Sequence, residues 1–338
     1  MRAPAFWYAP PGTAGSMLTA ALLAPASLVW TAATRWRLSG ARPWRAPLPV
    51  VCVGNLVAGG AGKTPVVLDL LARLRRDGLD AHALSRGHGG RLPGPLRVDP
   101  ARHTAAEVGD EPLLLAASAP AWIARDRAAG ARAAAAAGAG ALVLDDGFQN
   151  PGLAKDLSLL VVDGEAGVGN GRVIPAGPLR EPVADGLARA QALLLLGEDR
   201  RGIADLCRGR LPVLRGRLVP EPQAAAALAG RRVLAFAGIG RPEKFFRTLE
   251  ALGADIAARL PFPDHHPFTP AELRALLDRA AALDALAVTT EKDMVRLPAA
   301  LRGRVRALPV AVTWEEPDAL DRLLAPLLPG KEDHGQAQ

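Results

Sequence analysis

A glycine-rich segment that ends in Lys-Thr is the part of this chain best suited to phosphate chemistry. It consists of Val57, Ala58, Gly59, Gly60, Ala61, Gly62, Lys63 and Thr64. In such a loop glycine lets backbone N–H groups surround phosphate oxygens, the lysine reaches the β- and γ-phosphates, and the threonine hydroxyl ligates Mg²⁺. The segment therefore predicts a site for ATP and Mg²⁺. Val57 departs from the usual first glycine, which leaves a chance glycine-rich turn as the alternative.

Two adjacent acids, Asp145 and Asp146, follow the apolar run at residues 141–144. The carboxyl end of a buried parallel strand is where a nucleotide-bound metal finds an acidic ligand. Neighbouring carboxylates repel each other unless a cation lies beside them, and Mg²⁺ with ATP supplies that cation. We therefore expect Thr64, Asp145 and Asp146 to bind the metal. The alternative is a solvated Asp-Asp-Gly turn.

Asp110 and His265 are the candidates for handling a proton. A kinase that acts on a hydroxyl needs a proton acceptor near the γ-phosphate, and Asp110 precedes a helical stretch in a Gly-Asp-Glu-Pro segment. The alternative is that Asp110 is the N-cap of that helix. His265 and His266 adjoin in a proline-rich loop, so both cannot face the core. A histidine beside a catalytic aspartate can adjust its basicity, whereas ordinary loop histidines are the alternative.

Alternating strands and helices must position these residues. A short β-branched run at residues 49–53 precedes the glycine-rich loop, and residues 64–76 follow it with the spacing of an amphipathic helix. Further strands are predicted at residues 79–84, 141–144, 157–162, 193–196, 213–219, 233–237 and 285–289, and further helices at residues 112–117, 125–137, 242–252 and 270–282. This alternation predicts an α/β fold with a doubly wound, mostly parallel sheet of the P-loop NTPase kind.

The N-terminal region carries an almost wholly apolar stretch at residues 17–34, with aromatic and basic residues after it. A helix of that length extends about 27 Å, slightly less than a bilayer core. We favour a membrane-inserting helix, with Arg35, Arg37, Arg42 and Arg45 keeping the next domain in the cytoplasm. A buried core helix is the alternative. A signal peptide is rejected, because its cleavage would accompany export of the nucleotide site away from ATP.

The composition fits a packed globular protein with a basic balance. Hydrophobic residues make up 49% and charged residues 22% of the 338 residues, which argues against disorder. The net charge of +7 suits an anionic membrane, although scattered arginines explain it equally well. No run of basic and aromatic residues indicates nucleic-acid binding. Cys52 and Cys207 are far apart and predict buried free thiols, with neither a disulfide nor a zinc site.

Several segments taken together resemble the motifs of the lipid A 4′-kinase family, the tetraacyldisaccharide 4′-kinases. That family also lacks the first standard glycine of the phosphate loop. The similar segments are residues 54–65, 85–90, 109–112, 145–149, 169–181, 238–246, 264–265 and 290–293. They follow in one order over most of the chain, which is far more specific than the loop alone. His88 stands where the family has tyrosine and Asn150 where it usually has histidine, so no role is carried over to those two positions.

The resemblance implies transfer of the ATP γ-phosphate to the 4′-hydroxyl of a tetraacylated glucosamine disaccharide 1-phosphate, which forms lipid IVA in lipid A biosynthesis. It implies that Asp110 is the base and is paired with His265. It also implies that Lys63 and Thr64 hold phosphate and Mg²⁺, with Asp145 and Asp146 on the metal. The apolar helix resembles the family's membrane anchor, which implies a place at the cytoplasmic face of the Gram-negative inner membrane, beside the lipid A disaccharide precursor.

Four segments are expected along the chain. They are an N-terminal membrane-associated segment at residues 1–40, a P-loop kinase core at 48–225, a smaller C-terminal α/β lobe at 226–328 and a disordered tail at 329–338. Two other functions stay open. A membrane-associated P-loop ATPase that acts as a switch or insertion factor would hydrolyse ATP without lipid. A soluble small-molecule kinase, with its N-terminal helix in the core, would not sediment with membranes.

Overall fold

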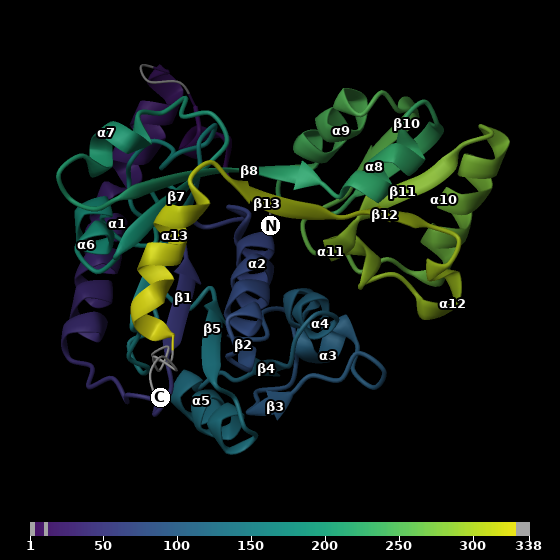
Figure 1. Cartoon of the computed structure of the whole chain (residues 1–338). Coiled ribbons are helices and arrows are strands. Elements are labelled where there is room, and N and C mark those ends of the chain that lie inside the picture. The colour runs from purple at the N-terminus through teal and green to yellow at the C-terminus, as the bar shows by residue number, and fades with distance from the viewer. Residues whose placement is uncertain (1–3, 10–12, 329–338) are drawn as a thin grey trace, which may run out of the picture.

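The computed structural model describes residues 4–9 and 13–328, and this part of the chain contains two sheets (Figure 1). The strands of the larger sheet are β1 (Val50–Gly54), β2 (Ala81–Ser85), β3 (Leu96–Arg97), β4 (Ala121–Ile123), β5 (Ala141–Asp145), β6 (Leu157–Asp163), β7 (Ala192–Leu196), β8 (Val213–Pro220) and β13 (Val310–Trp314). Their spatial order is β13-β8-β7-β6-β1-β5-β2-β4-β3. Only the two edge pairings, β13 with β8 and β3 with β4, are antiparallel. The tail predicted at residues 329–338 lies outside the described residues.

Helices cover both faces of the larger sheet, which makes it doubly wound as predicted. One face packs against α2 (Lys63–Arg76), α3 (Ala105–Val108), α4 (Asp110–Ala116) and α13 (Pro317–Leu324), and the other against α5 (Arg127–Ala136), α6 (Val183–Leu187) and α7 (Ile203–Cys207). Alternate residues of β1 supply the two cores, with Val51 and Val53 in one and Val50 and Cys52 in the other. The whole of β1 is buried, as its apolar sequence predicts. Short 3₁₀ helices lie at Ala5–Trp7 (η1) and Ala325–Leu327 (η2).

The smaller sheet is entirely parallel and is also covered on both faces. Its strands are β9 (Arg232–Ala237), β10 (Asp255–Pro261), β11 (Leu286–Thr290) and β12 (Arg306–Leu308), in the order β10-β9-β11-β12. Around it lie α8 (Pro222–Leu228) and α9 (Pro242–Ala251) on one face, α10 (Pro270–Ala282) and α12 (Ala299–Arg302) on the other, and α11 (Glu291–Met294) after β11. This sheet and its helices form the C-terminal lobe.

The chain returns from the C-terminal lobe to the larger sheet. Strands β8 and β13 pair side by side and reach from one lobe toward the other (Figure 1). Helix α13 then packs in the core of the larger sheet through Leu320 and Leu324. This differs from the expectation that residues 226–328 form one lobe, because residues from Val310 onward belong with the kinase core. Periodicity gives no signal of which sheet a strand joins.

The predicted strands and helices of the core are present, with bounds shifted by up to two residues. Strands β3, β4, β10, β12 and β13 were not predicted from the sequence. Strand β4 has only three residues, and β10 carries a register shift and is largely half-exposed, so neither shows a clear alternation. Cys52 and Cys207 are free and buried, which confirms the predicted thiols.

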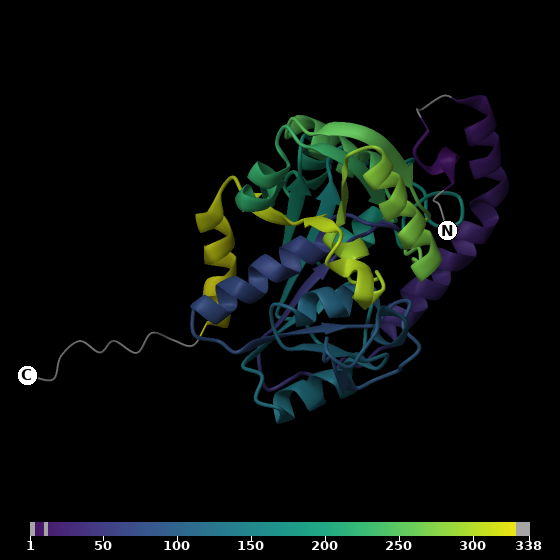
Figure 2. The ribbon, with the colours of Figure 1, turned by 90° about the vertical axis from the view of Figure 1, so that its right-hand side faces the viewer.

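The apolar N-terminal stretch forms one long helix, α1 (Ala14–Ser39), on the outside of the molecule (Figure 2). Among its described residues, Ala20, Ser27 and Thr34 are buried, and they form a narrow stripe that faces the rest of the protein. Leu22 is 73% exposed and Leu28 is 71% exposed, so the alternative of a buried core helix does not hold. Helix α1 is apolar and long enough to cross a membrane, which by itself is weak support for an anchor.

Candidate active site

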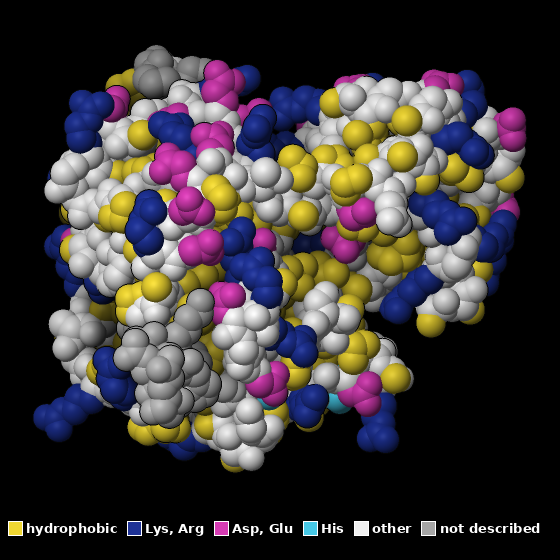
Figure 3. Space-filling model, viewed as in Figure 1, with side chains coloured by type: hydrophobic (Ala, Val, Ile, Leu, Met, Phe, Trp, Pro, Cys, Tyr) yellow, Lys and Arg dark blue, Asp and Glu magenta, His cyan; other side chains and the backbone are white. Residues whose placement is uncertain are grey.

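The carboxyl ends of strands from both sheets meet at a hollow between the lobes (Figure 3). The phosphate loop follows β1, and Asp145 ends β5 beside it. From the opposite lobe come Arg241, His265 and Lys292, which follow β9, β10 and β11. Ligands in doubly wound sheets bind at this edge, so the position fits a nucleotide site.

The phosphate loop has the backbone that its glycines allow. Gly59 and Gly62 have φ values of 121° and 81°, in the region that favours glycine. Helix α2 begins directly afterwards at Lys63, so its N-terminus points at the loop. Val57 pairs in an isolated antiparallel bridge with Leu179, which requires extended backbone and explains a β-branched residue where glycine is standard. The alternative of a chance glycine-rich turn does not fit this strand–loop–helix context.

Asp146 is held by two cations. Arg180 binds both of its carboxylate oxygens at 2.8 and 3.0 Å, and the Lys63 ammonium lies 3.5 Å away. Burial raises the pKa of Asp146, but Lys63 and Arg180 outweigh it and lower the pKa to about 2. Asp146 is therefore ionised at neutral pH, and it connects the phosphate-loop lysine to Arg180.

Asp145 is buried and lacks a partner. Neither of its carboxylate oxygens has a hydrogen bond within the described part of the chain. Burial, followed by the charge of Glu111, raises the pKa of Asp145 to about 8. A buried carboxylate without a partner is costly, and a divalent cation with hard oxygen ligands relieves that cost. The solvated-turn alternative is wrong for Asp145, which is 2% exposed.

The structure brings Asp110 and His265 together. His265 Nδ1 lies 2.9 Å from Asp110 Oδ2, and Arg296 Nε lies 3.3 Å from the same oxygen. Burial raises the pKa of Asp110, but His265 and the cations Lys292 and Arg296 lower it to about 2. Gly109 occupies the N-cap position of α4, so the alternative in which Asp110 serves as the cap is wrong.

A second ion pair lies next to this one. Lys292 Nζ is 3.0 Å from Glu111 Oε1 and 3.5 Å from His265 Nε2. The adjacent His266 turns away and contacts Glu272 at 3.1 Å, so only one of the two histidines serves the site. His88 meets the His265 ring edge-on, with centroids 5.8 Å apart. The lobes are thus joined at Asp110–His265 and Glu111–Lys292.

The loop at residues 169–181, here called the connecting loop, links α1 to the phosphate loop. From α1, Ser27 Oγ donates to Val173 O at 2.7 Å, and Trp30 Nε1 donates to Arg180 O at 2.9 Å. At its other side, Pro178 O accepts from Ala58 N at 2.8 Å. The same loop supplies the Arg180 guanidinium that binds Asp146. The outer helix is therefore connected to the nucleotide site through one short loop.

Several residues at the site were not singled out as functional from the sequence, namely Glu111, Arg180, Lys292 and Arg296. Glu111, Arg180 and Lys292 do lie in segments that carried the family resemblance, which was the available signal. The expected metal ligands Asp145 and Asp146 adjoin on β5 and its following turn, and Asp146 lies 3.5 Å from Lys63, the neighbour of Thr64 at the start of α2. Among the described residues, no three His, Cys, Asp or Glu side chains group as a metal site. A metal here would therefore need oxygens from the nucleotide as well.

Comparisons with known proteins agree over nearly the whole chain. A family model described as LpxK, tetraacyldisaccharide-1-P 4′-kinase, matches residues 19–328. The tetraacyldisaccharide 4′-kinase of Rhodospirillum centenum is 88% identical over 338 residues, 100% of both chains. That of Gluconacetobacter diazotrophicus is 57% identical over 324 residues, 96% of this chain and 97% of the relative. The crystal structure of LpxK from Aquifex aeolicus in complex with ATP has a TM-score of 0.74 and 28% identity, covering 92% of this chain and 99% of that chain.

Proposed function

The chain belongs to the tetraacyldisaccharide-1-P 4′-kinase family, and on that premise we propose how its residues carry out the reaction. It is a kinase that transfers the γ-phosphate of ATP to the 4′-hydroxyl of a tetraacylated glucosamine disaccharide 1-phosphate, in lipid A biosynthesis. A switch-type ATPase is not favoured, because the similarity to these kinases covers the full chain. The single observation that carries the site assignment is the Asp110–His265 pair beside the phosphate loop.

The nucleotide lies on the phosphate loop in this proposal. Backbone N–H groups of residues 57–64 bind the phosphate oxygens, and Lys63 reaches the β- and γ-phosphates. Because ATP brings negative charge, it competes with Asp146 for Lys63. Arg180 keeps Asp146 paired when the lysine turns to the phosphates.

The side-chain oxygens next to the phosphate loop suit a magnesium ion. The unpartnered Asp145 carboxylate, with Thr64 and Asp146, would hold the ion together with phosphate oxygens. When bound, Mg²⁺ neutralises charge on the transferring phosphate. Its charge also favours the ionised form of Asp145, which burial otherwise disfavours.

The Asp110–His265 pair takes the proton of the 4′-hydroxyl. Asp110 Oδ1 accepts from Glu111 N at 3.0 Å, and Oδ2 is occupied by His265 and Arg296. The expected base Asp110 is therefore surrounded by donors, while His265 is one-third exposed. We treat the two as a unit in which Asp110 orients His265 and stabilises its positive charge, and His265 Nε2 faces the incoming hydroxyl.

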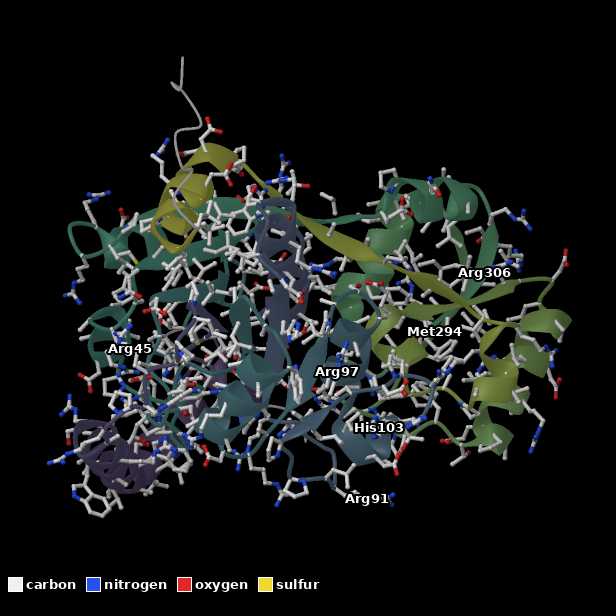
Figure 4. The ribbon with its side chains drawn as sticks, turned by 60° about the horizontal axis from the view of Figure 1, so that its bottom comes forward. Arg45, Arg91, Arg97, His103, Met294 and Arg306 are labelled. Carbon is white, nitrogen blue, oxygen red and sulfur yellow. The ribbon has the colours of Figure 1, made fainter. Side chains whose placement is uncertain are left out.

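The membrane is the proposed place of the reaction. Helix α1 exposes a broad apolar surface beside the connecting loop, and an amphiphilic acceptor must be reached at an interface. Arg45, which pairs with Asp156, lies on the α1 side of the molecule, opposite Arg306 in the C-terminal lobe (Figure 4). We place α1 in the inner membrane with the catalytic lobes on its cytoplasmic face, where ATP is available.

A direct assay tests this function. The protein is incubated with ATP labelled in the γ-phosphate and a detergent-dispersed tetraacyldisaccharide 1-phosphate, and the lipid is separated and counted. We expect label on the lipid, and none on a matched acceptor whose 4′-hydroxyl is replaced by hydrogen. Release of labelled inorganic phosphate at the same rate without any lipid, and no labelled lipid, would instead indicate the ATPase switch.

A further inference from the structure

Arg241 connects the C-terminal lobe to the phosphate loop. It precedes α9, and its Nη2 donates to Asp163 Oδ2 at 2.6 Å and to Gly60 O at 3.3 Å. Gly60 lies in the glycine-rich turn three residues before Lys63. Thus a guanidinium from the opposite lobe rests on the rim of the loop that holds the phosphates.

Asp163 fixes the direction of this guanidinium. Asp163 ends β6, and its Oδ1 accepts from the backbone N of Glu165 and Ala166 at 3.0 and 3.2 Å. Its Oδ2 also binds Lys244. Burial raises the pKa of Asp163, but Arg241 and Lys244 outweigh it and lower the pKa. The carboxylate is therefore anchored and ionised, and it holds Arg241 in place before any nucleotide arrives.

The loop that carries Arg241 is joined to the loop that carries the proton acceptor. His265 N donates to Gly238 O at 3.0 Å, and β9 and β10 are neighbouring strands. Arg241 therefore approaches the phosphate loop from the lobe that brings His265 to Asp110. The same lobe thus brings a cation to the rim of the phosphate loop and a histidine to Asp110, and a cation there suits the charge that develops on a transferring phosphate.

We propose that Arg241 binds the γ-phosphoryl group of ATP and stabilises it during transfer. The proposal rests on the kinase function above. A guanidinium has five N–H donors, and the contacts with Asp163 and Gly60 use only one nitrogen, Nη2, of a side chain that is 36% exposed. In the reaction a bond forms from the 4′-oxygen to the γ-phosphorus, and the bond from that phosphorus to the bridging oxygen of ADP breaks. The hydroxyl proton goes to the Asp110–His265 pair, and Arg241 gives up no proton.

The competing interpretation is that Arg241 only latches the lobes together. The two interpretations differ in whether the effect depends on the γ-phosphate, because a residue that only holds the lobes together affects the binding of ATP and ADP alike. Arg247 supplies the matched control. It lies on α9, which Arg241 precedes, is 58% exposed, and its guanidinium pairs with Glu165 at 3.1 Å rather than with the phosphate loop.

The test measures equilibrium binding of ATP and ADP, with Mg²⁺ and without lipid, to the full chain and its variants. We expect Arg241→Ala to weaken ATP binding at least tenfold and ADP binding less than twofold. Arg241→Lys should recover part of the loss, and Arg247→Ala should bind both nucleotides like the wild type. On lipid acceptor, Arg241→Ala should lose about 10³-fold or more in kcat, as arginines on transferring phosphates do.

Two outcomes would overturn the proposal. Equal weakening of ATP and ADP would assign Arg241 to a latch, and unchanged binding with unchanged kcat would remove it from the site. A melting temperature within a few degrees of the wild type shows that the variant is folded, and Arg241→Lys provides the comparison if Arg241→Ala is not. Because binding is measured without lipid, a wrong acceptor assignment would leave the ATP-to-ADP comparison intact.

Discussion

His265 Nδ1 and Asp110 Oδ2 lie 2.9 Å apart although the two residues are separated by 155 positions and come from different lobes. Asp110 is ionised, since its pKa is lowered to about 2. An ionised carboxylate can only accept, so Nδ1 carries the hydrogen and Nε2 is left as the acceptor. The contact therefore sets the tautomer of the histidine and assembles the proton acceptor only when both lobes are in place.

Removing either member of this pair should slow the chemical step. We expect Asp110→Asn and His265→Ala each to lower kcat by roughly 10²–10⁴-fold with little change in the KM for ATP, since general-base help has that size. The double variant should be hardly worse than the single ones, because the residues act as a unit. Steady-state kinetics of all three variants checks this. Losses that multiply in the double variant would contradict it.

The same pair predicts a pH dependence of stability. A carboxyl whose folded pKa lies below its unfolded value stabilises the fold above the unfolded value and loses this effect as pH falls through the folded value. For Asp110 that window runs from about pH 4 down to about pH 2. The difference in unfolding free energy between wild type and Asp110→Asn should shrink there by roughly 2 kcal/mol, from the shift at 1.36 kcal/mol per unit. Urea titrations at pH 5 and pH 2.5 measure it, and a constant difference would count against the pairing.

Lys63 should be indispensable for turnover. Lys63→Ala removes the charge that reaches the β- and γ-phosphates, and it leaves Asp146 with Arg180 as its remaining partner in an ion pair. We expect activity to fall below about 10⁻³ of wild type, in line with loss of a main electrostatic contact. Lys63→Arg should not restore it, because the guanidinium is broad and planar. Near wild-type turnover in Lys63→Ala would contradict the phosphate-loop assignment.

A substitution on α1 should change the affinity of the protein for ATP. Ser27 Oγ bonds both Val173 O and Ala176 N, and the connecting loop in turn holds the phosphate loop. Ser27→Ala leaves the buried Ala176 N unsatisfied at roughly 1–3 kcal/mol, whereas Val173 O keeps its hydrogen bond from Gly177 N, and we expect ATP affinity to fall by roughly tenfold. Thr19→Ala is the matched control, because Thr19 bonds only within α1, to Gly15 O. Calorimetric ATP binding measures both, and equal affinities would mean that the connecting loop holds its shape without α1.

Charges on the outer face of α1 should detach the protein from membranes. Leu22, Leu28 and Val29 are all at least 70% exposed and contribute little to the fold. Replacing each by aspartate should abolish sedimentation with vesicles of phosphatidylethanolamine and phosphatidylglycerol while leaving ATP binding unchanged. Leu206→Asp, at an exposed site on α7, should sediment like the wild type. If the triple variant still sediments, another surface carries the attachment.

The sequence predicted the core of the fold because its strands are apolar and its helices regularly spaced. Residues 49–53 and 64–76 predicted β1 and α2 on either side of the phosphate loop, and the structure has both. The Asp110–His265 contact followed from the family resemblance. Periodicity in the sequence describes neighbours along one element, so it says nothing about a hydrogen bond between two lobes.

The parts that the sequence missed depend on long-range pairing. Arg180 binds Asp146 across an irregular loop that has no periodic pattern, so the second partner of Asp146 was not foreseen. Strand β13 was missed because it has only five residues, most of them partly or fully exposed, and because its partner strand, β8, is distant in the sequence. Both features are contacts between segments that are distant in the sequence, so they follow only from the three-dimensional structure.

The return of β13 to the larger sheet makes the C-terminal lobe an insertion with two adjacent attachment points. Glu221 N donates to Pro309 O at 2.9 Å where the chain leaves and re-enters, so the two crossings lie side by side. During synthesis, β8 emerges from the ribosome long before its partner and remains an open edge until residues 310–314 follow. Open edges template aggregation, and contacts between distant segments form slowly. We therefore expect the inserted lobe to fold before β13 pairs with β8, which makes completion of the kinase sheet a late event in the maturation of the chain.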